Sequence, residues 1–175
     1  LILAKGLGVG ILSAALKKNE LSQEGYTEML TSTTQLNTPG SWLAAMDSVH
    51  AMTDVTGFGL LGHLLGICRG SQLTAELEFS QLPLLPIAEQ LAQQGFVTGA
   101  STRNWQSYGH EVKLSPQLAE WQHNLLTDPQ TSGGLLIACK ADAAAEIVLR
   151  LHGEGFGMAA VIGRLEAGAA QVVVS

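Results

Sequence analysis

Charged residues are scarce in this sequence: they make up 14% of its 175 residues, whereas globular domains carry roughly 25%. Acidic residues outnumber basic ones, with Asp+Glu 15 against Lys+Arg 9, which gives a formal net charge of −6. A protein that binds a DNA or RNA backbone needs clustered lysine and arginine, but Lys17-Lys18 is the only basic doublet. That doublet is also too short to hold an anionic membrane surface. We therefore expect neither a nucleic-acid nor a membrane partner.

Cysteines and long apolar runs are also few. Cys68 and Cys139 lie far apart in apolar sequence and form no CxxC pair, so neither a disulfide framework nor structural zinc is indicated. Without nearby cations to lower a thiol pKa, we interpret both as buried free thiols rather than nucleophiles. No apolar run reaches the ~18 residues of a membrane span, and no signal-peptide pattern opens the sequence. These features predict a cytoplasmic location.

The sequence is rich in apolar residues, at 46%, and in glycine, at 20 residues. This composition and length suit a folded chain with one sizeable core, and no repeat or linker divides it. We therefore expect a single domain over residues 1–175. The opening, Leu1-Ile2-Leu3-Ala4-Lys5, is apolar and lacks an initiator methionine. We expect from this that the chain is part of a longer protein.

Apolar spacing predicts interleaved strands and helices. Pro83 and Pro86 lead into one helix that Gly95 ends, and Ser22 caps another. The main predicted strands cover residues 1–10, 49–53, 73–79, 111–114, 135–139, 158–164 and 171–174, the last two forming a closing pair. The main predicted helices cover residues 11–18, 23–33, 42–46, 60–68, 87–94 and 141–152, with further helices after Ser101-Thr102 and from Pro116. Tight turns between some strands favour a mixed sheet with helices packed on it.

The densest chemical signal is the segment 52–63, in which a strand ends at Thr53-Asp54 and glycines turn the chain into a helix. Strand ends and helix N-termini are where open sheets bind anions, because free N–H groups point outward there. Mg²⁺ prefers one or two carboxylates together with water and substrate phosphate oxygens, which Asp54 would suit. Asp54 could equally cap the helix or close an Asx turn. The segment is neither a Walker A loop nor a GxGxxG fingerprint.

Two further polar segments have alternative interpretations. The loop 127–134, with its hydroxyls and double glycine, could approach a ligand closely or form a tight loop with satisfied polar groups. In the segment 98–104, Arg103 could pair with a phosphate or with a neighbouring carbonyl or carboxylate. His63 is interpreted as packed or capping, since no His pair has ligand spacing. Lys5, in apolar sequence, either extends its amine to solvent or pairs with a group outside this chain.

Together these motifs resemble selenophosphate synthetase (selenide, water dikinase). The resemblance covers essentially the whole chain and is carried, in order, by residues 35–38, 53–63, 95–100 and 126–136. What matches is the C-terminal half of that enzyme. The Asp-x-Thr-Gly turn and the Ser-Gly-Gly loop also resemble, more loosely, a wider superfamily that includes aminoimidazole ribonucleotide synthetase, thiamine-monophosphate kinase and a hydrogenase maturation factor.

The resemblance implies an α+β domain with three α/β/α layers and a mixed sheet, packed against an N-terminal domain that builds most of the ATP site and the homodimer. The intact enzyme would convert selenide, ATP and water into selenophosphate, phosphate and AMP. Asp54 matches the family's Mg²⁺-ligating aspartate. The resemblance also implies that the catalytic cysteine or selenocysteine, its partner lysine and the other metal-binding aspartates belong to the N-terminal half. The alternatives are another ATP-using member of the superfamily, or a non-catalytic lid or interaction module when isolated.

Overall fold

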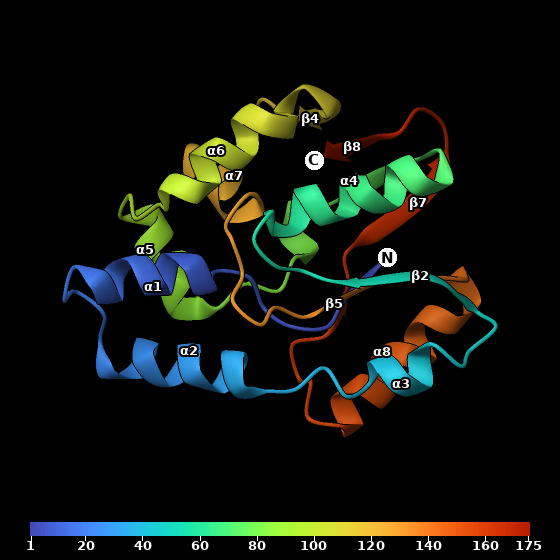
Figure 1. The fold of residues 1–175 in the computed structure, drawn as a ribbon, viewed down its shortest axis with the longest axis horizontal. Helices are drawn as coiled ribbons and strands as arrows, with labels where there is room; N and C mark the ends of the chain where they lie inside the picture. Colours follow the sequence, from blue (N-terminus) through green and yellow to red (C-terminus); the bar gives the residue numbers. More distant parts are fainter.

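The structure, a computed structural model, describes all 175 residues (Figure 1). The strands are β1 (Ile2–Leu3), β2 (Val49–Asp54), β3 (Leu73–Leu77), β4 (Val112–Leu114), β5 (Leu135–Cys139), β6 (Ala160–Val161), β7 (Gly163–Ala167) and β8 (Gln171–Val174). The helices are α1 (Val9–Lys17), α2 (Gln23–Thr34), α3 (Gly40–Leu43), α4 (Gly59–Ser71), α5 (Pro86–Gln93), α6 (Gly99–Tyr108), α7 (Glu120–Leu126) and α8 (Ala144–Gly153).

The strands form two four-stranded sheets, where the sequence predicted one. The first, in the order β2-β5-β1-β6, is antiparallel throughout. The second, in the order β4-β8-β3-β7, is mixed, because β8 runs parallel to both β3 and β4. The segment 160–167 joins the two, since β6 belongs to the first sheet and β7 to the second. The predicted closing pair of strands is therefore wrong: β3 lies between β7 and β8.

Two apolar cores lie on opposite faces of the first sheet. Successive residues of a strand point to opposite faces, so Leu3 and Leu136 enter a core of 30 buried residues, whereas Ile2 and Ile137 enter one of 9. The smaller core is closed by α3 and α8, and the larger one includes side chains of α1, α4 and α5. Helices thus cover both faces of this sheet, as Figure 1 shows. The predicted α+β class with helical layers around strands is confirmed.

The first ten residues do not form the long strand that the sequence predicts. Only Ile2–Leu3 is a strand, and α1 already begins at Val9. Gly8, at φ +122°, turns the chain, and its amide and the next three are taken up by side chains far away in the sequence. Those partners are remote in the sequence, so the local pattern of apolar residues and glycines gives no sign of them. That pattern alone favours a strand.

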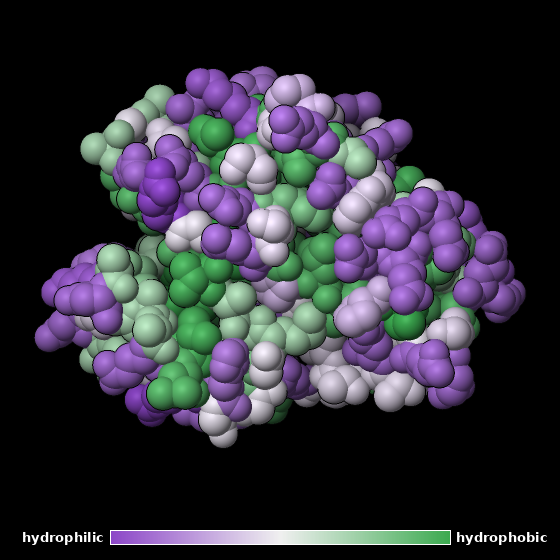
Figure 2. Space-filling model, turned by 180° about the vertical axis from the view of Figure 1, so that it is seen from behind, coloured by the Kyte–Doolittle hydropathy of each residue, from purple (hydrophilic) through white to green (hydrophobic).

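The surface opposite to that of Figure 1 shows apolar side chains in a band across its middle, between hydrophilic outer parts (Figure 2). The large apolar residues most exposed to solvent are Leu36, Leu149 and Phe58. None of the helices has the length and apolar character needed to cross a membrane.

Candidate functional site

Asp54 is the last residue of β2, where it pairs with Leu135 of β5. Its side chain is exposed. It caps no helix, because α4 begins after Phe58 and has no side-chain capping hydrogen bond. Helix capping is therefore wrong as an interpretation of Asp54, and its carboxylate accepts no hydrogen bond that would close an Asx turn. A carboxylate is held at the end of a paired strand with its oxygens free to bind a ligand.

The turn that follows Asp54 is fixed on both sides by hydrogen bonds. The Val55 amide donates to the Gly134 carbonyl at 2.9 Å, and the Thr56 amide donates to His63 Nε2 at 3.0 Å. His63 thus accepts through an unprotonated Nε2, and burial lowers its pKa while the nearby Asp54 charge opposes that shift. The interpretation of His63 as a packed or capping residue is confirmed. Gly59, at φ +68°, lets the turn approach the Thr127 backbone, which a Cβ would meet at 2.7 Å.

Side chains of the loop 127–134 cap helix α1. Asp128 Oδ2 accepts from the amides of Gly10 at 2.9 Å and Ile11 at 3.3 Å, and Gln130 Oε1 accepts from those of Gly8 at 3.1 Å and Val9 at 3.2 Å. These are the four amides that a helix N-terminus leaves without an intrahelical partner. The alternative of a tight loop is therefore the one seen, with Asp128 Oδ2 and Gln130 Oε1 bonded within the chain.

Asp128 is fully buried, and its second oxygen, Oδ1, has no hydrogen-bond partner. Burial raises the pKa of this carboxyl to about 7, although the bonds from the Ile11 and Gly10 amides and from Gln130 favour the charged form. Gln130, also buried, donates from Nε2 to Asp128 and so links the two capping side chains. The loop is therefore a structural clamp on α1.

The double glycine of this loop serves contact with the protein's own backbone. A Cβ on Gly133 would lie 2.1 Å from the Val55 carbonyl oxygen, and one on Gly134 would lie 2.4 Å from the Lys5 amide nitrogen. Both glycines hold the loop against the Asp54 turn and the first strand. Close approach of a ligand is not needed to explain them.

We expect Gly133→Ala to lower the free energy of unfolding by about 2 kcal/mol, because the added methyl must push backbone apart. Gly66→Ala is the matched control: it lies inside α4 with nothing within 4 Å of the added Cβ. There the change should stabilise by roughly 0.5–1 kcal/mol. Urea unfolding of both variants measures the difference, and equal effects at the two positions would contradict the assignment.

The segment 98–104 forms the start of α6. Thr98, rather than Ser101 or Thr102, is the cap: its Oγ1 accepts from the Ser101 amide at 3.1 Å. Ser101 is instead buried, with Oγ 2.6 Å from Thr127 Oγ1. Asn104 Nδ2 donates to the carbonyls of Gly57 at 2.9 Å and Thr127 at 3.0 Å. The segment is thereby tied to both the Asp54 turn and the loop 127–134.

Lys5 is buried, and both of its predicted roles are wrong. Its Nζ donates to three carbonyls, those of Ser32 at 3.1 Å, Gln35 at 2.6 Å and Ser132 at 2.7 Å. Two of these carbonyls lie at the C-terminal end of α2, where a cation is favoured by the helix dipole. Desolvation lowers the pKa of Lys5. The side chain joins α2 to the loop 127–134 instead of reaching solvent or another chain.

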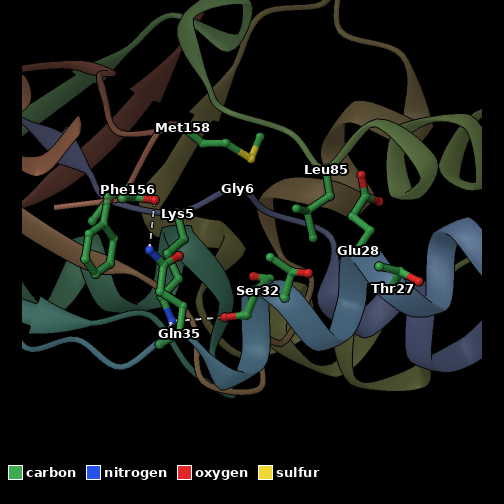
Figure 3. Close-up of a pocket in the computed structure, with 13 residues that line it drawn as sticks. Lys5, Gly6, Thr27, Glu28, Ser32, Gln35, Leu85, Phe156 and Met158 are labelled. Atoms are coloured by element: carbon green, nitrogen blue, oxygen red, sulfur yellow. Dashed lines mark hydrogen bonds between the residues drawn. The ribbon is translucent and has the colours of Figure 1, made fainter. Parts of the chain in front are cut away.

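Beside Lys5 lies a cavity of about 270 Å³, shown in Figure 3. Leu85, Phe156 and Met158 supply apolar walls, and Glu28 and Ser32 supply polar ones. Glu28 is engaged by the Ile87 amide at 3.1 Å, and the buried Ser32 hydroxyl has no partner. None of the segments 53–63, 98–104 and 127–134 lines this cavity.

A second cavity, of about 580 Å³, is lined by residues from all three of those segments and from α1. Arg103 lies at its edge, exposed and without a carboxylate partner, so the predicted pairing with a neighbouring carboxylate is not seen. The structure thus brings together residues as far apart in the sequence as Gly10 and Thr131, beside Gly57 of the turn after Asp54.

Metal ligands and nucleophiles are sparse. No group of three or more His, Cys, Asp or Glu side chains is placed to hold a metal ion. Both cysteines are free thiols, and desolvation raises the pKa of each. Cys68 is buried as predicted, whereas Cys139 is only partly buried, because it is the last residue of β5. Sequence reasoning missed Asn37, whose Nδ2 donates to the Gly133 carbonyl at 2.8 Å and whose buried Oδ1 has no partner. The only signal for it was its place in the segment 35–38.

Comparison with known proteins gives one family over the whole chain. Residues 1–175 match the family model described as "AIR synthase related protein, C-terminal domain". Among curated proteins, the chain is 58% identical to selenide, water dikinase of Pseudomonas straminea over 99% of its length and 49% of the relative. It is 55% identical to the protein of that name from Rhizobium meliloti, over 99% of this chain and 50% of the relative. The chain thus spans about half the length of these relatives.

Solved structures share the fold at low identity. HypE of E. coli superposes with a TM-score of 0.64 at 20% identity, over 99% of this chain and 45% of that one. Thiamine-monophosphate kinase from Stenotrophomonas maltophilia gives 0.63 at 19%, over 99% of this chain and 49% of that one. A structure of HypE in complex with ATP gives 0.54 at 16%, over 99% of this chain and 46% of that one.

Proposed function

Since the chain belongs to the family of AIR synthase-related C-terminal domains, we propose that it is the C-terminal domain of a selenide, water dikinase. In the intact enzyme it would complete an ATP site and take part in converting selenide, ATP and water into selenophosphate, phosphate and AMP. The observation that carries this proposal is identity of 58% and 55% to proteins of that name over 99% of the chain. The solved HypE with ATP supports nucleotide use in the same fold.

Asp54 is the residue that we propose for the metal. Its exposed carboxylate fits one ligand of Mg²⁺, which commonly takes one or two carboxylates with the remaining positions filled by water and substrate phosphates. No complete metal cluster exists within the chain. Such an ion would neutralise charge that develops on the phosphate oxygens when a phosphoanhydride bond breaks. The role of this chain is to hold Asp54 rigidly at the edge of a paired strand.

A second domain is part of the proposal, because the relatives are about twice as long as this chain. Phe58, 62% exposed in the turn after Asp54, and Leu36, 73% exposed beside Asn37, are apolar side chains that such a domain would cover. We propose that it supplies the nucleophile, the remaining metal ligands and the homodimer contacts. The two free thiols suit the reducing cytoplasm.

The 175-residue chain by itself should neither hydrolyse ATP nor make selenophosphate, because it carries one candidate metal ligand and no activated thiol. The measurement is AMP formation with Mg²⁺, ATP and selenide, with the full-length protein as the positive control. AMP produced by the isolated chain at a rate near that of the full-length protein would contradict the division of roles.

Another ATP-using activity of the superfamily is the alternative, in keeping with the shared fold of thiamine-monophosphate kinase. That likeness is at 19% identity, against 58% for the selenide, water dikinase relative. A panel of acceptors tested with ATP and the full-length protein separates the two, since only the dikinase forms AMP in a selenide-dependent reaction.

A further inference from the structure

The cavity of about 580 Å³ lies between the side of α1, which lines it from Gly10 to Lys17, and the N-terminal end of α6. The two helices lie one above the other at the left of Figure 1. The segment 129–131 closes the inner side. The lining residues that could contact an anion are Lys17, Lys18, Gly99, Ala100 and Arg103.

The charge of this cavity is opposite to that of the chain. Three of the nine lysines and arginines line it, and no aspartate or glutamate does, although the chain carries a net charge of −6. None of the three forms an ion pair, and Lys18 instead lies 4.7 Å from the ring centroid of Phe96. The cations that do pair with glutamates lie elsewhere: Arg69, Arg150 and Arg164.

Backbone donors add to this positive charge. In the first turn of α6, the Ser101 amide is taken by Thr98, whereas the amides of Gly99 and Ala100 have no intrahelical acceptor. The partial positive charge of the helix N-terminus lies on the same wall as Arg103. An arginine fork beside free helix amides is a recurrent way of holding a phosphate group.

The binding wall is also rigid before any ligand arrives. Buried Ser101 and Asn104 fix α6 to Thr127, and Asn104 also fixes it to the turn at Gly57. The opposite wall is held by Gln130, whose Oε1 accepts from two amides at the start of α1. Little backbone entropy therefore remains to be lost when an anion binds, and the remaining cost is that of ordering the exposed side chains of Lys17, Lys18 and Arg103.

We propose that this cavity binds the phosphate groups of a small phosphorylated molecule, with Arg103, Lys17 and Lys18 as the cationic contacts and the start of α6 as the backbone contact. Its volume and three cations suit a diphosphate better than a single phosphate. The proposal stands on the cavity alone and holds whether or not the chain is part of a dikinase.

The test is calorimetric titration of the 175-residue chain with inorganic pyrophosphate, in EDTA so that no metal bridge through Asp54 contributes. The chain has its own two apolar cores, and cooperative thermal unfolding checks each variant first. We expect saturable binding that weakens as KCl is added and is tighter than that of inorganic phosphate. Arg103→Gln, and Lys17→Gln with Lys18→Gln, should each weaken binding at least about tenfold, which is ~1.4 kcal/mol.

Lys113→Gln is the matched control: it removes the same charge from an exposed position on β4, outside the cavity. It should leave pyrophosphate binding unchanged, as should Asp54→Asn. The proposal is overturned if pyrophosphate does not saturate, or if Lys113→Gln weakens binding as much as Arg103→Gln, because the effect would then be general electrostatic attraction. Unaltered pyrophosphate binding in an Asp54→Asn enzyme that has lost activity keeps this proposal separate from the proposed function.

Discussion

Asp54→Asn in the full-length protein should fold normally and lose at least about 100-fold in the rate of AMP formation. The amide keeps the size of the side chain but removes a charge that an Mg²⁺ ion would need, and losses of this size are usual when transition-state charge stabilisation is removed. Because the Asp54 side chain is exposed and caps no helix, we expect the substitution to leave the fold unchanged. The measurements are selenide-dependent AMP formation and thermal unfolding.

Asp47→Asn provides the control for this substitution. Asp47 is also exposed, and it lies before β2 instead of at its end, so the same chemical change should leave activity intact. Wild-type turnover in Asp54→Asn would remove Asp54 from the proposed metal site. A lowered unfolding temperature together with lost activity would show that the residue acts on the fold.

Asp128→Ala should lower the free energy of unfolding by about 3–4 kcal/mol, more than Gly133→Ala does. The substitution leaves the Gly10 and Ile11 amides without acceptors in a buried place and deprives Gln130 of a partner. Leaving a buried polar group unpaired costs about 1–3 kcal/mol, and loss of a helix cap costs ~1 kcal/mol. Asp142→Ala, at an exposed position, is the control and should change stability little. Urea unfolding measures both.

Stability should also depend on pH through Asp128. Its pKa is raised from the ordinary 3.8 of an aspartate to about 7 in the folded chain, so between these values the folded state holds a proton that the unfolded state has released. The stabilising contribution is complete below about pH 4 and is lost as the pH rises through about 7, with a slope of up to about 1.4 kcal/mol per pH unit. Asp128→Asn should remove this part of the pH dependence. An unchanged profile in the variant would refute the assignment.

Local sequence patterns correctly predicted those helices and strands that depend on residues close to them in the sequence. Ser22 caps α2, Gly95 follows α5 with φ +90°, and β5 covers the predicted residues 135–139. Each depends on neighbours within a few positions, such as a hydroxyl at a helix start or an unbroken apolar run. The predicted strand ending at Thr53-Asp54 and the helix after the glycines were also found, which placed Asp54 at the edge of a sheet.

Long-range contacts decided the rest. Lys5 meets carbonyls 27, 30 and 127 positions away, and Gln130 caps a helix that begins 121 positions earlier. Arg150 pairs with Glu154 and stacks on the Trp42 ring, which belongs to a helix more than 100 positions earlier in the chain. In each case the partner of a polar side chain is a group that only the folded chain brings close. The residues next to that side chain in the sequence do not specify the partner.

The sequence by itself determined the kind of protein: an acidic α+β chain whose motifs identify its family and place one free carboxylate after a strand. Only the tertiary structure decided that Asp128 and Gln130 serve the fold, that Lys5 is internal, and that three cations converge on one cavity. The physical reason is that a helix end, a buried amine and an anion pocket are each completed by groups that become neighbours only when the chain has packed.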